Sequence, residues 1–328
     1  MRITRKRVTE MSSNEITEIE CFLDANFSTT FHDPDFNHVV SNVFKTDFFY
    51  DAAYNDGGEL VGLCPYHSLR KGLLTMTYSN PAMYGVPYGG WIIKCQGVSV
   101  IELLKHSKIS CIEAITYWSV PQLNNNGYSR VKNKKRFQTA IISLQQDEDS
   151  IWHKVINSKR RNMIRKAMKN NVEIEKVDCT RFEEYYRLTQ KKVPCGHMKT
   201  KLREYYTGIL KQYIPKRKAM ILLAKVRSNY VAGVIVLRNK HIAHYWLGAS
   251  RKNVDNLGQG ELLQWEAIRW AKRNGSGYYD LCVIEPERLP NIATFKLGFS
   301  KETVPFYCIT KRTLAYRALS KLQRIVAN

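Results

Sequence analysis

Apolar runs of strand length alternate along the chain with longer segments whose apolar residues recur every three to four positions. In the second half, apolar runs at 221–226 and 231–237 flank a short polar turn and predict a β-hairpin. A third strand is predicted at 241–248, followed by an amphipathic helix at 261–274 and a strand at 278–283. The pattern therefore predicts three strands, a helix and a further strand in that order.

The first half contains a similar strand, turn and strand at 50–66. The spacing from Ala53 to Gly62 equals the spacing from Ala224 to Gly233, and matched positions lie 171 residues apart. This offset predicts two copies of one α/β unit. A chance match between two unrelated hairpins is the alternative.

Residues 151–170 contain no acidic side chain and predict one continuous helix. Trp152 and Ile156 fall on its apolar face. The opposite face is cationic, and its members are Lys154, Arg161, Arg165 and Lys169. Such a face is typical either of a solvated surface or of a site for phosphate groups, which guanidinium groups bind bidentately.

Composition narrows the class of protein. The 328 residues include 51 Lys and Arg against 29 Asp and Glu, a net charge of +22, which divides into −1 for residues 1–150 and +23 for residues 151–328. An apolar content of 44% argues against intrinsic disorder. The apolar runs are too short to span a membrane, and the basic N-terminus leads into no apolar signal core, so we expect a cytoplasmic protein.

The eight cysteines are scattered, without a CxxC pair or zinc-ligand spacing. We expect reduced thiols in the core and no metal site.

Seven short motifs in both halves carry a resemblance to a known family. In chain order they are TFHDPDF at 30–36, LVGLCP at 60–65, YGG at 88–90, RNMIRKA at 161–167, YWLGAS at 245–250, YYDL at 278–281 and TFKLGF at 294–299. Together they resemble the FemABX family of the GCN5-related N-acyltransferase (GNAT) superfamily over about residues 20–310. Only two short helical segments at 181–213 stand where better-known members have a coiled-coil arm. The chain therefore resembles the short, BioF2-like branch.

The resemblance implies an α/β (α+β) fold of two tandem GNAT-like domains, each with a mixed, mostly antiparallel sheet flanked by helices. The expected domains are 1–145, on the acceptor side, and 146–328, which is catalytic and strongly basic. The implied activity is transfer of an aminoacyl group, without a cofactor, from aminoacyl-tRNA to an amine of a nucleotide sugar, peptide or polysaccharide of the cell envelope. Two alternatives stay open: an acyl-CoA-dependent GNAT N-acyltransferase, and a non-catalytic RNA-binding protein on a GNAT scaffold.

N-acyl transfer requires an amine that loses a proton and a carbonyl whose oxyanion is stabilised. The resemblance places Lys296 beside the reacting carbonyl or the terminal phosphate of tRNA, although an exposed lysine after a core phenylalanine looks the same in sequence. Phe295 is a candidate for stacking on adenine or the aminoacyl end, or a core aromatic. Asp280 is a candidate proton acceptor or the cap of a turn. Tyr245 is a candidate donor to the acceptor or leaving group, or a half-buried strand tyrosine.

Two glycine-containing segments complete the candidates. A tyrosine and two glycines of the first half either shape the acceptor cleft or form a plain turn: Tyr88, Gly89 and Gly90. Gly258 and Gly260 precede a helix, where GNAT enzymes bind the pyrophosphate of acyl-CoA on free backbone N–H groups. Asp255 stands where the resemblance expects Arg or Gln, and its carboxylate repels a pyrophosphate, so an ordinary loop fits equally well.

Overall fold

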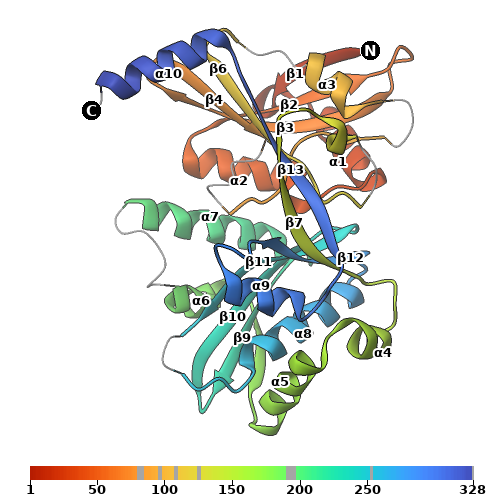
Figure 1. Ribbon diagram of the computed structural model, residues 1–328, viewed down its shortest axis with the longest axis vertical. Helices are drawn as coiled ribbons and strands as arrows, with labels where there is room; N and C mark the ends of the chain where they lie inside the picture. Colours follow the sequence, from red (N-terminus) through yellow and green to blue (C-terminus); the bar gives the residue numbers. More distant parts are fainter. Residues whose placement is uncertain are drawn as a thin grey trace. The chain divides into compact units, whose positions relative to one another are not determined.

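The computed structural model describes residues 1–79, 85–94, 98–106, 110–123, 127–189, 197–251 and 254–326, without the side chains of residues 71, 197–199 and 322–326 (Figure 1). The chain forms two compact units. Unit 1 comprises Met1–Phe137 and Pro305–Asn328, and unit 2 comprises Gln138–Val304. Within the described residues, no helix combines the length and the apolar character needed to cross a bilayer.

Unit 1 contains a sheet in the strand order β1-β2-β3-β4-β6-β13, with β5 paired to β3. Its strands are β1 (Arg2–Arg7), β2 (Asp47–Tyr54), β3 (Leu60–Lys71), β4 (Leu74–Ser79), β5 (Ile92–Ile93), β6 (Glu113–Trp118) and β13 (Thr303–Arg312). Its helices are α1 (Ser13–Ala25), α2 (Pro34–Phe44), α3 (Val100–His106) and α10 (Leu314–Val326), with short 3₁₀ turns at Val8–Glu10, Thr30–His32 and Tyr128–Arg130.

Unit 2 contains a sheet in the order β7-β12-β11-β10-β9-β8. Its strands are β7 (Lys134–Ser143, which begins in unit 1), β8 (Glu173–Val177), β9 (Ala219–Val226), β10 (Asn229–Arg238), β11 (Ile242–Ser250) and β12 (Tyr278–Ile284). Its helices are α4 (Glu148–Ser150), the π-helix Ile151–Val155, α5 (Ser158–Lys169), α6 (Phe182–Thr189), α7 (His197–Tyr213), α8 (Gln259–Arg273) and α9 (Pro290–Leu297), with a 3₁₀ turn at Cys179–Arg181.

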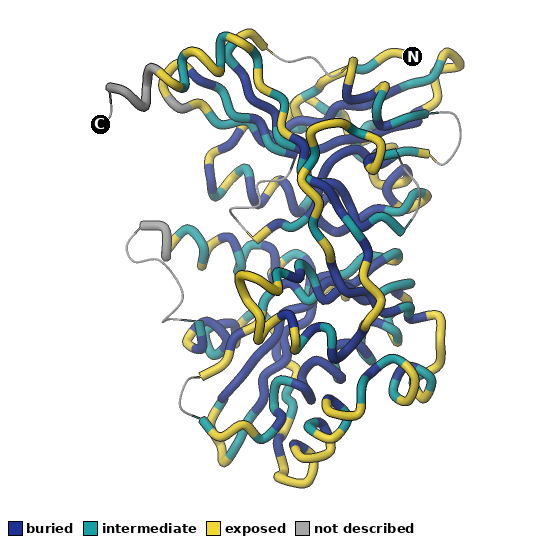
Figure 2. The backbone as a smooth tube through the Cα atoms, in the orientation of Figure 1, coloured by how far each residue is buried: buried dark blue, intermediate teal, exposed yellow. Residues whose placement is uncertain are grey.

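Helices cover both faces of the unit 2 sheet, which explains why β9 and β10 are apolar without interruption. Met220 and Leu222 belong to the core cluster that includes α8. Leu223 lies beside Gly233 on the opposite face, where Tyr185 of α6 packs so closely that a Cβ on Gly233 would lie 2.9 Å from its ring. The central strands are accordingly buried along most of their length (Figure 2).

The predicted repeat is present, because β2-β3-β4-α3-β6 and β9-β10-β11-α8-β12 follow one order and each ends in a parallel pair of strands. Ala53 pairs directly with Gly62. Ala224, however, pairs with Ala232, because a bulge after Tyr230 shifts the register of β10 by one residue. The equal spacing in sequence therefore does not correspond to equal pairing.

The predicted continuous helix at 151–170 is wrong. The π-helix ends at Val155, because the next residue, Ile156, has an extended backbone with ψ of 125°. A separate helix, α5, begins after Asn157, whose side chain accepts a hydrogen bond from the Arg160 N–H at 2.9 Å. This N-cap starts a new helix and breaks the expected alignment of faces. Lys154 therefore lies on a different helix from Arg161.

The two units also divide the chain differently from the expected boundary at residue 145. Residues 305–328 belong to unit 1, because β13 pairs antiparallel with β6 from Cys308↔Trp118 to Arg312↔Ala114. By units, unit 1 has 20 basic and 13 acidic residues, a net charge of +7, and unit 2 has 31 and 16, a net charge of +15. Dividing the sequence into halves therefore hides the positive charge of unit 1, because it places the basic C-terminal segment in the second half.

Candidate active site

In unit 2, the parallel strands β11 and β12 part from each other. Their register runs from Ile242↔Tyr278 to His244↔Asp280 and ends there. Beyond this point β11 continues along β10, and β12 continues along β7. We call the place where these two strands part, with the residues just beyond it, the fork.

Each strand carries a bulge at the fork. In β11 the register shifts between Ile235↔Leu247 and Val236↔Tyr245, so Trp246 is the extra residue. In a regular strand Tyr245 and Gly248 would lie on opposite faces, whereas the extra residue brings them to the same face. A Cβ on Gly248 would overlap the Tyr245 hydroxyl, so any larger residue there would displace that hydroxyl.

The bulge in β12 is fixed by Asp280, which is fully buried. One carboxylate oxygen accepts hydrogen bonds from the Cys282 N–H at 2.7 Å and from the Thr139 hydroxyl. The other lies 2.8 Å from Nδ1 of His244. The hydrogen bond from the Cys282 N–H to the Asp280 side chain, two residues earlier, stabilises Cys282 in the left-handed backbone conformation, with φ of 59°. Asp280 is thus placed to position the fork, and its burial separates it from solvent.

Among the described residues, one group of side chains converges as metal ligands do: His244, Asp280 and Cys282, with ligand atoms within 4.8 Å of one another. Both carboxylate oxygens of Asp280 already accept hydrogen bonds inside this group and from Thr139. These hydrogen bonds therefore hold the three side chains and the ends of β11 and β12 in place.

Lys296 of α9 brings a cation to the fork. Lys296 is only 8% exposed. Its Nζ donates a hydrogen bond to the Val283 carbonyl of β12 at 2.8 Å and lies 5.9 Å from the centroid of the Tyr245 ring. Burial lowers the pKa of Lys296. Burial also raises the pKa of Tyr245 to about 12, with a smaller contribution from Cys282. The Lys296 Nζ and the protonated phenol of Tyr245 can both donate hydrogen bonds to a developing negative charge.

Arg160 anchors the helix that carries Lys296, and sequence analysis missed it. Its guanidinium forms a buried ion pair with Glu261 of α8 at 2.6 Å, donates to the Thr294 carbonyl at 3.2 Å and stacks over the Phe295 ring at 4.9 Å. Phe295 thus serves as a packing surface in the core cluster. Helical spacing offered a signal, because Arg160 shares one face with the buried residues Ile164 and Ala167.

The four cations expected to form one ridge have separate environments. One guanidinium N–H group of Arg161 lies 3.2 Å from each of the Trp152 and His153 carbonyls and also donates to the Ile156 carbonyl, so Arg161 caps the π-helix. Arg165 lies over the Trp152 ring at 5.5 Å. The other two, Lys154 and Lys169, are exposed. Arg161, Arg165 and Lys169 still share one face of α5, at i, i+4 and i+8, so the break at Asn157 removes only Lys154 from the predicted ridge.

Of the two candidate glycines, Gly258 precedes α8 and Gly260 is its second residue. Gly258 is the N-cap of α8 with φ of 87°, and a Cβ there would overlap the carbonyl oxygen of Met163 in α5. Lys166 of α5 donates to the Asn256 carbonyl in the same loop at 2.7 Å. Gly260 lies near Phe295, since its Cβ would be 3.9 Å from that ring. Close approach of the loop to α5 accounts for Gly258 without a ligand.

The three candidates of the first half lie inside unit 1. Tyr88 is fully buried, with its ring centroid 5.1 Å from that of Phe306. The Gly89 N–H donates to the Trp118 carbonyl at 2.6 Å, and the Gly90 N–H donates to the Ser79 hydroxyl at 2.7 Å. This segment therefore bridges the end of β6 and the end of β4.

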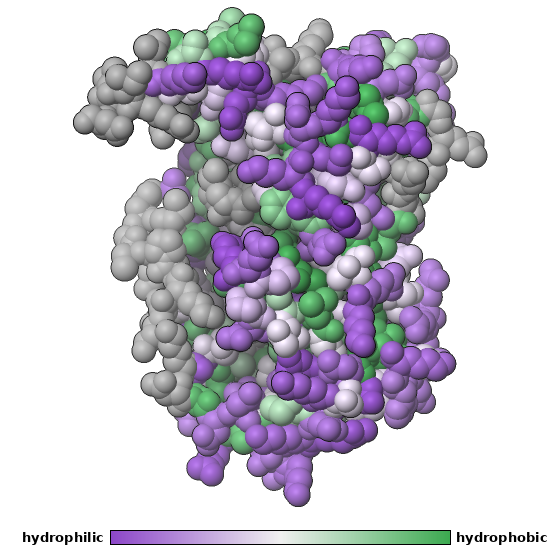
Figure 3. Space-filling model, in the orientation of Figure 1, coloured by the Kyte–Doolittle hydropathy of each residue, from purple (hydrophilic) through white to green (hydrophobic). Residues whose placement is uncertain are grey.

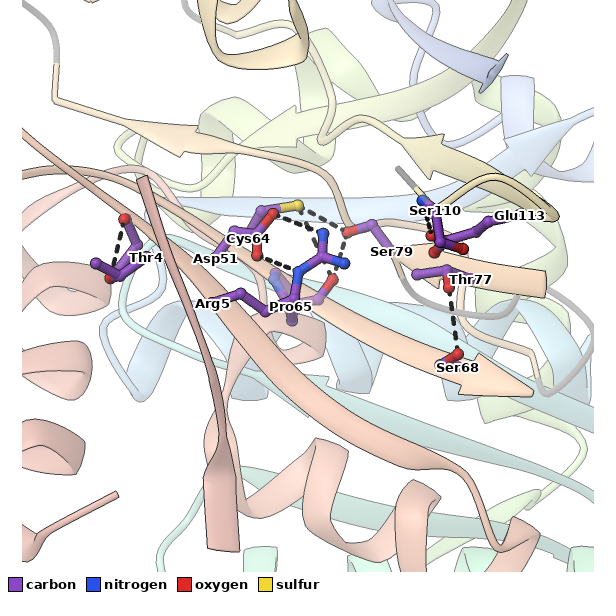
Figure 4. A network of polar contacts seen from close by, with 11 residues as sticks. Thr4, Arg5, Asp51, Cys64, Pro65, Ser68, Thr77, Ser79, Ser110 and Glu113 are labelled. Atoms are coloured by element: carbon purple, nitrogen blue, oxygen red, sulfur yellow. Dashed lines mark hydrogen bonds and ion pairs between the residues drawn. The ribbon is translucent and has the colours of Figure 1, made fainter. Parts of the chain in front are cut away.

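Ser79 is the polar junction of that bridge. Its hydroxyl donates to the Pro65 carbonyl at 2.7 Å and lies 3.1 Å from the Cys64 sulfur (Figure 4). All of these groups are buried. The arrangement is that of a closed core.

Comparison with known proteins finds a family match within unit 2. The sequence of residues 158–288 matches the acetyltransferase (GNAT) domain family. No curated protein matches the chain. Among solved structures, FemX is 12% identical with a TM-score of 0.69, and the alignment covers 98% of this chain and 99% of FemX.

Two further structures share the fold. The C-terminal domain of a putative lysylphosphatidylglycerol synthetase from Agrobacterium fabrum has a TM-score of 0.55 at 10% identity, covering 95% of this chain and 96% of that domain. A tandem GNAT protein from the clavulanic acid biosynthesis pathway has a TM-score of 0.53 at 11% identity, covering 94% of this chain and 98% of that one. The expected fold of two tandem GNAT-like units is confirmed.

Proposed function

We propose that the chain is an acyltransferase, because residues 158–288 match the GNAT domain family and the chain has the fold of FemX, and that the fork of unit 2 transfers an aminoacyl group from aminoacyl-tRNA to an amine of a cell-envelope precursor. The observation that carries the proposal is the buried Nζ of Lys296, held on the Val283 carbonyl beside Tyr245 where β11 and β12 part. The FemABX-like motifs and the likeness to a protein named for joining lysine to phosphatidylglycerol support an aminoacyl rather than an acetyl group.

The chemistry follows from these two donors. The acceptor amine attacks the ester carbonyl, and Lys296 donates a hydrogen bond to the oxyanion that forms. The bond from the carbonyl carbon to the ribose oxygen then breaks, and that oxygen gains the proton that the amine loses. A pKa of about 12 keeps the Tyr245 phenol protonated at neutral pH, so Tyr245 can deliver that proton and recover one from the amine. Asp280 acts through His244 and Cys282 as a positioning residue.

Acyl-CoA is the alternative donor. The one feature of the loop at Gly258 that favours acyl-CoA is its position at the start of α8, where free backbone N–H groups can bind a pyrophosphate. The exposed carboxylate of Asp255 in the same loop opposes a pyrophosphate. The net charge of +15 on unit 2 favours a polyanionic donor of either kind. The identity of the donor therefore has to be decided by experiment.

The test measures transfer of radiolabel from mixed aminoacyl-tRNA, and separately from acetyl-CoA, to a lysine-containing peptide precursor of the cell envelope. We expect transfer from aminoacyl-tRNA, reduced 100- to 1,000-fold by Lys296→Met. The matched control is Lys301→Met, an exposed lysine of the same unit, which should change the rate less than twofold.

Three outcomes contradict parts of the proposal. Transfer from acetyl-CoA alone overturns the tRNA donor and leaves the fork as the site. Salt-sensitive retention of tRNA without any transfer overturns catalysis in favour of RNA binding. Equal activity of wild type and Lys296→Met removes Lys296 from the mechanism.

A further inference from the structure

Unit 1 contains a groove that none of the chemistry above uses. It has a volume of about 670 Å³ and is lined by Asn133, Lys135, Cys308, Thr310, Arg312, Tyr316, Arg317, Ser320 and Lys321. Its volume lies within the range of sites that bind small ligands. All of these residues belong to unit 1, so the groove is complete within that unit.

The floor of the groove is the solvent-facing side of the sheet. Along β13, Tyr307 and Ile309 point into the apolar core, and the alternating residues Cys308, Thr310 and Arg312 face the groove. Lys135 reaches the same face from the start of β7. This strand alternation places two cations on the floor.

The wall of the groove is α10. Tyr316, Arg317, Ser320 and Lys321 are spaced one, three and one residues apart, which puts them on one side of a helix. Hydrophilic side chains are also prominent along α10 in the visible surface (Figure 3). The helix thus turns its cationic side toward a cationic floor, while Leu314 is 82% exposed.

This arrangement is electrostatically unfavourable without a counter-ion. Four cations line the groove, and no lining residue is acidic. Among the described residues, none of the four has a carboxylate within salt-bridge distance, whereas Arg5 of the same unit pairs with Asp51 at 2.7 Å. Like charges that converge around one hollow repel each other, and an anion bound between them removes that repulsion.

We propose that this groove binds an anion that carries two or more phosphate groups. Arg312 and Arg317 offer planar guanidinium groups, which bind phosphate oxygens bidentately, and Lys135 and Lys321 add point charges. The hydroxyls of Thr310 and Ser320 supply neutral hydrogen-bond donors, and the Tyr316 ring offers an apolar surface to an attached group. A single phosphate would leave most of this charge uncompensated.

The test titrates the full-length chain calorimetrically with inorganic pyrophosphate, ADP and orthophosphate at 50 mM and 150 mM salt. We expect pyrophosphate and ADP to bind at least tenfold more tightly than orthophosphate, with affinity falling as salt rises. Tighter binding of ADP than of pyrophosphate assigns the Tyr316 surface to a nucleoside, and equal binding assigns the site to the phosphate chain alone. Either result supports the proposal.

Variants separate this groove from the fork. Arg317→Gln with Lys321→Gln should weaken pyrophosphate binding at least tenfold, whereas the matched change of two exposed cations outside the groove, Lys132→Gln with Arg136→Gln, should change it less than threefold. Circular dichroism should show the same helix content in both double variants. Lys296→Met should bind pyrophosphate as wild type does, whatever its effect on transfer.

Three results would overturn the proposal. The first is no binding of any phosphate at 50 mM salt, and the second is equal weakening by the two double variants. The third is loss of pyrophosphate binding in Lys296→Met alone, which would move the anion to the fork. None of these results depends on whether the proposed transfer reaction occurs.

Discussion

The two units follow one order of strands and helix but differ where their parallel strands end. In unit 1, β4 and β6 pair over five positions from Thr75↔Glu113 to Ser79↔Tyr117, and the Gly89 and Gly90 N–H groups then bind to Trp118 and Ser79. In unit 2, β11 and β12 pair over three positions, and a bulge then directs β12 along β7. In unit 1, the place where β4 and β6 part, which corresponds to the fork, is therefore closed by main-chain hydrogen bonds. In unit 2, polar side chains occupy the fork.

The helix between the parallel strands differs as well. In unit 2, α8 has 15 residues and begins at Gln259, after the N-cap Gly258, whereas the described part of α3 in unit 1 is Val100–His106. The comparison teaches that the fold supplies the fork in both units, but side chains and a bulge decide which copy can perform chemistry.

Breaking the buried ion pair of each unit should produce the largest effect. Arg160→Met leaves Glu261 buried without its partner and should cost about 3–5 kcal/mol of unfolding free energy. It should also slow transfer, because α9 and Lys296 lose their anchor. Arg5→Met leaves Asp51 unpaired in unit 1 and should lower stability without slowing transfer at temperatures where the protein is folded.

Urea unfolding measures both losses, and hydrogen exchange assigns each loss to its unit. The double variant Arg160→Met with Glu261→Met is the control for an uncompensated charge and should recover most of the stability. An Arg5→Met variant that slows transfer as much as Arg160→Met would erase the distinction between the units.

Glycine substitutions sharpen the comparison at each fork. Gly90 has φ of 76°, and a Cβ there would overlap the Tyr128 hydroxyl, so Gly90→Ala should cost about 2–3 kcal/mol and leave the transfer rate unchanged. Gly248→Ala meets only the end of the Tyr245 side chain, which can swing away. We expect it to cost less than about 1.5 kcal/mol but to slow transfer.

Thermal unfolding and single-turnover transfer rates, measured on the same samples, separate the two effects. Full transfer activity in Gly248→Ala would mean that the Tyr245 hydroxyl takes no part in the reaction. A slower transfer rate in a folded Gly90→Ala variant would give the closed fork a catalytic role.

The last prediction concerns pH and is confined to unit 1. Burial lowers the pKa of His67 from 6.5 to about 3, while Thr46 and Asn37 hold the neutral ring at 2.8 and 2.9 Å. The unfolded chain therefore binds an extra proton between about pH 3 and 6.5, so stability is full above pH 6.5 and falls as pH drops. At pH 5 the loss should be about 2 kcal/mol.

His67→Gln removes the titration and replaces the imidazole with a neutral side-chain amide that can still form hydrogen bonds. Its unfolding free energy should vary less between pH 7 and pH 5 than that of wild type, with the difference confined to hydrogen exchange in unit 1. Parallel pH curves for the two proteins would contradict the low pKa of His67.

Much of the fold could be predicted from sequence, because the repeated hairpin and the strand–helix–strand order depend on local apolar periodicity. The helix break at Asn157 could not, since one side-chain cap outweighs a continuous helical pattern. The pairing of β13 with β6 also escaped prediction, because it joins residues about 190 positions apart with no local signal. In the site, Lys296 was predicted from the resemblance. Arg160 was missed because it stands in a run of basic residues, and its helical spacing to Ile164 and Ala167 was the signal that could have found it.

The route of the chain also has a consequence for synthesis. Unit 2 is one continuous segment, Gln138–Val304, whereas unit 1 is built from both ends of the chain and needs Tyr307 and Ile309 in its core. A ribosome makes the chain from its N-terminus, so the first 137 residues emerge early but lack the strand that covers the edge of β6. The unit begun first is therefore completed last, and until then its open strand edge is available for pairing with other chains.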